Sequence, residues 1–242
     1  MKLANKKLSV TKEYKFEVKI FKAVDDTALC EDFAKGHRKV LEDFGVKNVT
    51  SNNNKWMNNP DAYCITYHSH LLGMVGGIRV EISSPAFELP ILSAVGKYDG
   101  SLSEEVKGKE DMGIGEVCGM WTDRRVAGIG VGNGLVRFSL FTLIQTQTYY
   151  GICLVTDYTK MLVTRYGFNI ADQFGNNGTF EYPDERYLAT VMMMDDTQLP
   201  QYRMMEEAKI GERLAQSQRN IREKIDSHFV NLDITTCFNT KG

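Results

Sequence analysis

Alternating apolar and polar residues mark the first regular element of the chain. From Tyr14 to Ile20 every second residue is apolar, which predicts a half-buried β-strand. Between Asp25 and Phe44 the apolar residues recur at helical spacing instead. Asp25 is a suitable N-cap for that helix, and Gly45 is a suitable terminator. The pattern therefore predicts a strand followed by a helix.

Two β-rich runs follow a polar loop, at residues 62–68 and 74–82. Only a short turn separates them, so we expect an antiparallel hairpin. The segment from Ser83 to Met112 contains two prolines and three glycines and has no sustained period. We expect it to be a long loop, and long loops in compact domains are often functional.

A strand, a glycine-rich turn and a helix form the central unit of the sequence. The patterns place the strand from Glu116 to Thr122 and the helix from Leu135 to Tyr150. Gly151 ends this helix. A buried strand, a helix capped by Asp157 and two further strands are then predicted at residues 152–156, 157–166, 168–174 and 186–194.

The last part of the chain is highly charged. Its pattern from Leu199 to Phe229 is helical with a narrow apolar stripe, which would pack on the domain or on a second copy in a homodimer. No internal repeat or convincing linker divides the rest. We therefore expect an α/β protein with one domain over residues 1–196 and a helical C-terminal extension over residues 197–242.

The composition excludes several classes of function. Across 242 residues, 29 Lys and Arg nearly cancel 31 Asp and Glu, so no overall charge attracts nucleic acid. No run approaches the roughly 18 apolar residues of a spanning helix, and the polar amino terminus is unlike a signal peptide, so we expect a cytoplasmic protein. Five scattered cysteines lack a CxxC pair, and no third ligand accompanies His68 and His70, so we expect no metal site.

The central turn contains four glycines, at positions 128, 130, 132 and 134. Residues without side chains let backbone N–H groups approach an anion, and a helix start favours phosphate. A P-loop is excluded because no Gly-Lys-Ser/Thr follows, and a dinucleotide fold places its motif after the first strand of a βαβ unit. The turn is thus a phosphate site or, alternatively, only a tight turn with close helix packing.

The run Arg125-Val-Ala-Gly128-Ile-Gly130 resembles the Q/R-x-x-G-x-G/A pattern of the GNAT superfamily, the N-acyltransferases that use acyl-coenzyme A. Tyr166-Gly167-Phe168 resembles the Gly-Phe signature after the family's fourth helix, and Gly130-Val-Gly132-Asn-Gly-Leu135 offers a second register for the turn. The resemblance implies a mixed, mostly antiparallel central sheet flanked by helices. It also implies that the donor's phosphate end is held by Arg125, Val126, Ala127, Gly128, Ile129, Gly130, Val131 and Gly132. We expect the strand backbone at Met120 and Trp121 to hold the pantetheine arm and polarise the thioester carbonyl.

The N-terminal half is similar to one GNAT subgroup, the acyl-homoserine-lactone synthases and related N-acyl amino acid synthases. The similar segments are Arg38-Lys-Val-Leu, Trp56, Asp61-Ala-Tyr-Cys-Ile, Gly76-Gly-Ile-Arg79-Val-Glu, Glu88-Leu-Pro90 and Glu116-Val. Cys118-Gly119 stands where the subgroup has Ser/Thr-Arg, and Val163 stands where many GNAT enzymes have a tyrosine that protonates the departing thiolate. Because the subgroup commonly uses acyl carrier protein, that protein is an alternative donor.

Glu116 is the candidate general base. A carboxylate on a strand beside the cleft would accept a proton from an ammonium substrate, and desolvation would raise its pKa. The alternative is a surface or salt-bridged glutamate. We expect an N-acyltransferase that moves an acyl group from acetyl-CoA or a longer acyl-CoA to a small-molecule amine. The alternatives are an acyl-carrier-protein-dependent N-acyl amino acid or autoinducer-type synthase, and a non-catalytic coenzyme A-binding module.

Overall fold

A computed structural model describes residues 12–46, 54–195, 213, 219–225 and 228–238. Its strands are β1 (Glu13–Lys22), β2 (Ala62–Ser69), β3 (Gly73–Ile82), β4 (Ile114–Thr122), β5 (Tyr150–Val155), β6 (Asn169–Ile170), β7 (Thr179–Glu181), β8 (Leu188–Met194), β9 (Asn220–Ile225) and β10 (His228–Thr236). Its α-helices are α1 (Thr27–Asp43), α2 (Gly100–Lys109), α3 (Val131–Gln145) and α4 (Asp157–Thr164).

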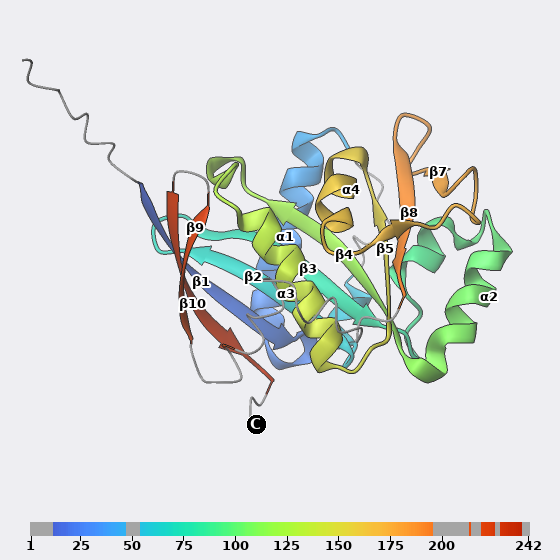
Figure 1. The fold of residues 1–242 in the computed structure, drawn as a ribbon, viewed down its shortest axis with the longest axis horizontal. Coiled ribbons are helices and arrows are strands. Elements are labelled where there is room, and N and C mark those ends of the chain that lie inside the picture. The colour runs from blue at the N-terminus through green and yellow to red at the C-terminus, as the bar shows by residue number, and fades with distance from the viewer. Residues whose placement is uncertain (1–11, 47–53, 196–212, 214–218, 226–227, 239–242) are drawn as a thin grey trace, which may run out of the picture.

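All these strands belong to one mixed sheet (Figure 1). The strand order is β6-β8-β5-β4-β3-β2-β1-β10-β9, with β7 paired to β8. Pairing is parallel between β1 and β10 and between β4 and β5, and antiparallel elsewhere. The predicted mixed, mostly antiparallel sheet flanked by helices is confirmed.

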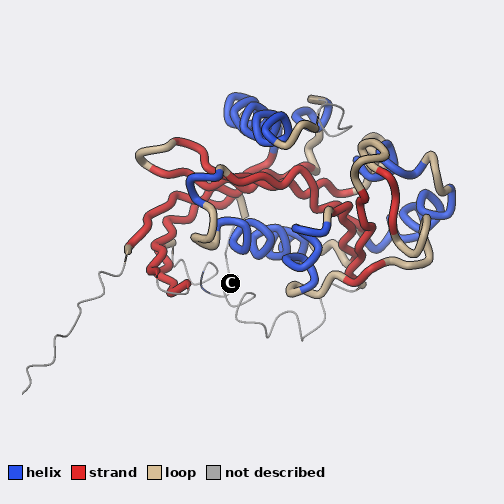
Figure 2. Tube along the Cα trace, turned by 90° about the horizontal axis from the view of Figure 1, so that it is seen from above, coloured by secondary structure: helices blue, strands red, loops and turns tan. Residues whose placement is uncertain are grey.

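Helices cover both faces of the sheet (Figure 2). A Cβ on Gly77 would lie 2.5 Å from the ring of Phe33 in α1, whereas a Cβ on Gly76 would lie 3.0 Å from Val131 in α3. Successive strand residues point to opposite faces, so α1 and α3 cover opposite sides of β3. The absence of side chains at these two glycines lets both helices pack closely.

The first strand and helix are confirmed, with one correction at the cap. Asp26, not Asp25, is the N-cap of α1, and its side chain accepts a hydrogen bond from the Leu29 N–H at 2.9 Å. Asp25 lies in the short 3₁₀ turn before the helix. Gly45 follows the last turn with a φ of 75°, as expected for a residue that ends a helix.

The segment from Ser83 to Met112 contains more structure than the predicted loop. It forms α2 and, at Leu92–Gly96, a single π-helical turn. Leu102 and Val106 are both fully buried, in an apolar cluster that includes Ile114 and Val191 of the sheet. Two apolar residues in a short, charged helix give too weak a periodicity to reveal it.

The central unit is confirmed with shifted helix limits. β4 begins two residues before the predicted start, and α3 runs from Val131 to Gln145 rather than from Leu135 to Tyr150. The predicted helix began too late because all four glycines were assigned to the turn. The hairpin of β2 and β3 is confirmed, as are β5 and α4, although Thr156 rather than Asp157 is the N-cap of α4.

The predicted helical C-terminal extension is wrong where the structure describes it. Residues 220–225 and 228–236 form β9 and β10, and β10 pairs with β1 in the main sheet. Val230, Leu232 and Ile234 alternate with polar residues and are each at most 3% exposed, so they extend the core in a strand pattern. Residues 197–212 and 214–218 of the predicted extension lie outside the described residues.

Candidate functional site

The parallel strands β4 and β5 part soon after they begin to pair. Their register contains three pairs and ends with Glu116 opposite Ile152. Beyond that point, among the described residues, β4 pairs only with β3, as far as Thr122 opposite Gly76. In this part of the chain the backbone groups on the other edge of β4 have no strand partner, so they are available to an extended ligand arm.

Met120 lies on β4 where the two strands have parted, and its side chain is on the face that α3 and α4 cover. A Cβ on Gly132 of α3 would lie 3.2 Å from Met120 Cε and 3.7 Å from Leu162 of α4. The neighbouring Trp121 points to the opposite face, where it packs against Gly36 and Phe33 of α1. The two residues that were predicted to hold the donor arm therefore offer their side chains to different faces and only their backbone to the gap.

The glycine-rich turn presents the start of α3. Gly130 is the N-cap, with a φ of 86° and no side-chain cap, and Gly128 also has a positive φ, of 74°. Within the described part of the chain, no acceptor is found for the amides of Val131, Gly132 and Asn133. Open N–H groups and the positive end of the helix dipole favour an anion at this turn.

The other predicted turn residues divide into two kinds. Val126, Ile129 and Val131 are buried and fix the turn to the core, whereas Ala127 and Gly128 are exposed. Gly134 has a packing role, because a Cβ there would lie 1.9 Å from the Tyr67 hydroxyl. Close helix packing thus holds for Gly134, whereas the phosphate site at the other glycines stays a prediction.

Arg125 binds within the turn itself. Its Nε donates to Asp123 Oδ1 at 2.9 Å, and Arg125 lowers the pKa of that carboxyl to about 2, mainly through side-chain hydrogen bonds. The guanidinium is exposed, and its positive charge is neutralised by Asp123. The resemblance implies that Arg125 helps to hold the donor, and in the structure its guanidinium pairs with Asp123.

A cavity of about 210 Å³ lies beside the turn. Gly130 and Asn133 line it, together with Arg137 of α3 and Arg165 at the end of α4. Arg137 Nη1 lies 2.7 Å from Glu223 of β9, while its Nε is buried without a partner among the described residues. No local pattern singles out Arg137 or Arg165, because only the fold brings them to the turn.

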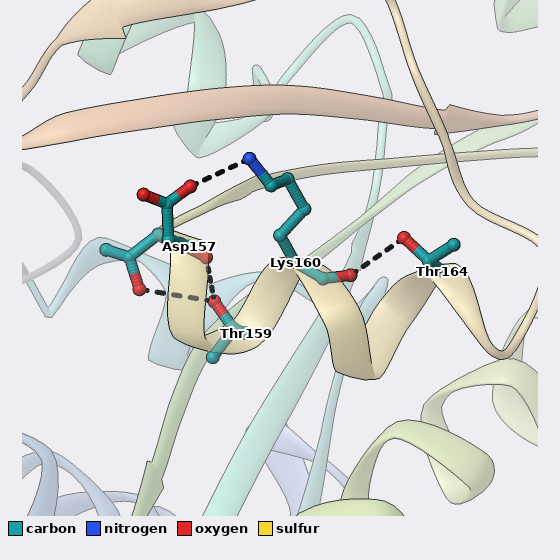
Figure 3. Close-up of polar contacts among 5 residues, drawn as sticks. Asp157, Thr159, Lys160 and Thr164 are labelled. Atoms are coloured by element: carbon teal, nitrogen blue, oxygen red, sulfur yellow. Dashed lines mark hydrogen bonds and ion pairs between the residues drawn. The ribbon is translucent and has the colours of Figure 1, made fainter.

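Helix α4 follows β5. Val163 stands at the position expected for a general-acid tyrosine, and the nearby tyrosines are Tyr158 and Tyr166. Its first turn is held locally, by Lys160 with Asp157 and by Thr159 with the Thr156 carbonyl (Figure 3). Val163 is buried and Tyr158 is 88% exposed. Tyr166 is buried and donates to the Asn133 carbonyl at 3.2 Å.

A cluster of polar side chains lies on the other face of β3 and β4, which α1 covers. In the register of these strands Arg79 is opposite Cys118, and Glu81 is opposite Glu116. Residues opposite each other share a face, so the four side chains gather on one side of the sheet. Arg79 lies 3.2 Å from Glu81, and Cys118 Sγ lies 3.6 Å from the same carboxylate.

Glu116 is neither exposed nor ion-paired in the described structure, which overturns the alternative of a surface or salt-bridged glutamate. It is 3% exposed, and Oε2 accepts a hydrogen bond from the Ile91 N–H at 2.7 Å. Burial, with a smaller contribution from Glu81, raises the pKa of Glu116 from 4.5 to about 8. This carboxyl can therefore exchange a proton near neutral pH.

His37 and His68 are the other titratable candidates. His37 is a buried residue of α1, and burial, together with Arg79 and Arg38, lowers its pKa to about 4. His68 hydrogen-bonds to Thr66 at 2.9 Å. Among the residues that the structure describes, no group of His, Cys, Asp and Glu could hold a metal ion. In that same part of the chain, no helix is both long enough and apolar enough to cross a membrane.

The mixed sheet, the glycine-rich turn and α3 match the fold that the resemblance predicted, a fold of the GNAT type. Solved structures agree. The N-acyl amino acid synthase FeeM from uncultured soil microbes aligns over 78% of this chain and 93% of its own, with a TM-score of 0.57 and 16% identity.

Two further solved structures share the fold. BjaI, a CoA-dependent acyl-homoserine lactone synthase determined with SAM and isopentyl-CoA, covers 92% of this chain and 93% of its own, with a TM-score of 0.54 and 11% identity. MesI, another CoA-dependent acyl-homoserine lactone synthase, covers 86% of this chain and 97% of its own, with a TM-score of 0.51 and 14% identity. No protein-family model and no curated protein matches the sequence.

Proposed function

We propose that this protein transfers an acyl group from a coenzyme A thioester to the amine of a small molecule. The observation that carries the proposal is Glu116, a carboxyl with a pKa of about 8 at the point where β4 and β5 part. A base with a pKa near the operating pH is efficient, because it is partly ionised and still takes up a proton readily. The enzymes FeeM, BjaI and MesI, which share the fold, support the same reaction class.

In this proposal, the group that acts on the amine and the groups that bind the donor lie on opposite faces of the sheet. Glu116 would accept the proton that the ammonium loses, directly or through a water, so that the free amine attacks the thioester carbon. A C–N bond forms and the C–S bond breaks, giving an amide and the thiol of coenzyme A with release of one proton. An N–H of β4 near Met120 would stabilise the carbonyl oxygen as its charge grows.

In this proposal the glycine-rich turn would hold the donor's phosphates. The open amides of Val131, Gly132 and Asn133 would bind the pyrophosphate, and Arg165 would supply positive charge beside them. Acyl carrier protein, which brings a single phosphodiester, is the alternative donor. N-acyl amino acid synthesis and autoinducer-type synthesis are more specific forms of the proposed acyl transfer, and they differ in donor and acceptor.

A non-catalytic coenzyme A-binding module is the second candidate. Val163 at the usual tyrosine position favours it, since neither Tyr158 nor Tyr166 takes that position. The module predicts binding without turnover.

The test combines binding and turnover. Thermal shifts with acetyl-CoA, a long-chain acyl-CoA and acylated carrier protein would identify the donor. Release of the coenzyme A thiol with a panel of amines would then measure transfer. We expect Glu116→Gln to lower kcat by about 10²- to 10⁴-fold without weakening the donor shift, and Glu104→Gln on exposed α2 to act like the wild type.

Binding without turnover of any amine would support the module instead. No stabilisation by any donor at millimolar concentration would contradict both candidates.

A further inference from the structure

The cavity of about 210 Å³ is enclosed by α3 and by the strands β1, β2, β9 and β10. Phe16, Tyr67, Val230 and Leu232 form its apolar wall, and all four are buried. In the part of the chain that the structure describes, no lining residue belongs to β4 or β5, the strands whose parting forms the candidate active site. The cavity is therefore a second hollow, over the other end of the sheet.

The cavity and the gap between β4 and β5 lie on different sides of α3. Each residue turns an α-helix by about 100°, so Asn133 and Arg137 lie roughly 100° and 140° around the helix from Gly132. Gly132 faces Met120 and Leu162 beside the gap. Asn133 and Arg137 line the cavity instead. A ligand in the cavity would thus leave the gap open.

The charged groups that line the cavity do not balance. Arg137 Nη1 lies 2.7 Å from Glu223, so these two charges neutralise each other. Arg165 is exposed and has no ion-pair partner among the described residues. Two arginines and one glutamate give the described lining an excess of one positive charge. A single anionic group on a ligand would neutralise it.

The volume limits the size of such a ligand. A cavity of about 150 Å³ holds benzene, and a water molecule takes up about 30 Å³. The cavity of about 210 Å³ therefore has room for a body of about six carbons and for a group as large as about two waters, such as a carboxylate. An ion without an apolar body would leave the apolar wall in contact with water.

We propose that this cavity binds a small monocarboxylate with an apolar body of about six carbons. The carboxylate lies at Arg137 and Arg165, and the body packs against Phe16, Val230 and Leu232. The ligand gains free energy from the burial of its apolar body and from the neutralisation of the excess positive charge. This site goes beyond the proposed function and does not depend on it.

The first experiment measures the binding of benzoate by thermal shift and by ligand-detected NMR. Benzamide has the same ring without the charge, and acetate has the carboxylate without the ring. We expect benzoate to bind at least tenfold more tightly than benzamide, as for a charged hydrogen bond, and at least tenfold more tightly than acetate, which buries less apolar surface. Benzoate that binds no more tightly than either compound, or that does not bind at millimolar concentration, would overturn the inference.

The second experiment changes the two ends of the cavity separately. Arg165→Gln should weaken benzoate at least tenfold and leave benzamide unchanged, and because Arg165 is exposed the fold should be retained. Val230→Phe would fill the cavity with its own ring and should abolish the binding of benzoate, with the acyl-CoA thermal shift unchanged.

Arg186→Gln, which removes an exposed arginine outside the cavity, is the matched control and should bind benzoate like the wild type. Arg165→Gln decides the question if Val230→Phe does not fold. Binding of benzoate to Arg165→Gln or to folded Val230→Phe as tight as to the wild type would place the ligand elsewhere, and the inference would be wrong.

Discussion

Replacing Glu116 with glutamine should change how folding stability depends on pH. The pKa of Glu116 is raised from 4.5 to about 8, chiefly by burial, so the folded chain keeps a proton that the unfolded chain loses. Its contribution to stability is thus full below pH 4.5 and is lost as the pH rises through about 8. At about 1.4 kcal/mol for each pH unit, the loss is on the order of 5 kcal/mol.

His37 acts in the opposite direction and must be separated from this effect. Its pKa is lowered from 6.5 to about 4, first by burial, so the folded chain resists protonation. The stability that neutral His37 contributes is present above pH 6.5 and is lost as the pH falls through about 4. The wild type and Glu116→Gln both contain His37, so its contribution cancels in the difference between their stabilities.

The assay is urea unfolding followed by tryptophan fluorescence at several values from pH 5 to 9. The glutamine of Glu116→Gln can still accept the hydrogen bond from the Ile91 N–H, which measures 2.7 Å in the wild type, so the variant removes only the titration. We expect the stability of the wild type relative to the variant to fall steadily up to about pH 8 and then to level off. A constant difference would refute the conclusion that Glu116 is buried as a neutral acid.

Further predictions concern packing and are measured by the same urea assay. Gly134→Ala should lower the free energy of unfolding by about 1–3 kcal/mol, because its Cβ would overlap the Tyr67 hydroxyl. Gly108→Ala on exposed α2 is the matched control and should be neutral or slightly stabilising, because a Cβ there meets nothing within 4 Å. Leu102→Ala should cost about 2–5 kcal/mol because Leu102 is fully buried, and a loss below 0.5 kcal/mol would show that α2 is not part of the core.

Local patterns predicted the centre of the fold better than its end. The alternation in β1 and the hairpin of β2 and β3 arise within a few residues, and both are confirmed. The prediction for the end of the chain failed because β10, besides pairing with β9, is held in the main sheet by its parallel pairing with β1, more than 200 residues earlier. Charged residues in β9 gave a helical pattern that tertiary pairing overrode.

The candidate site was predictable only in part, for the same reason. Glu116 was selected from its place on a predicted strand, and the structure adds that it is buried. Its pairing with Glu81 follows from the register of β3 and β4, which no local pattern contains. Arg79 was noted only as part of a resemblance, because its unmatched donors become apparent once Trp56 and Glu81 surround it.

The raised pKa of Glu116 also bears on the missing tyrosine acid. A thiol of ordinary acidity has a pKa of about 8.5, close to the value of about 8 for Glu116. In the proposed function, the proton that Glu116 would take from the amine would pass to the departing thiolate, directly or through water, at little cost in free energy. A separate acid would then be unnecessary.

We therefore expect Tyr158→Phe and Tyr166→Phe each to leave kcat within about threefold of the wild type at saturating substrates, whereas loss of a true acid lowers it by about 10²-fold or more. Tyr158 is 88% exposed, and the Tyr166 hydroxyl already donates to the Asn133 carbonyl. The pH profile of kcat/KM should rise with an apparent pKa near 8 and lose that rise in Glu116→Gln. A hundredfold fall in kcat for either phenylalanine variant, with its thermal stability unchanged, would assign the acid to that tyrosine and leave Glu116 as the base alone.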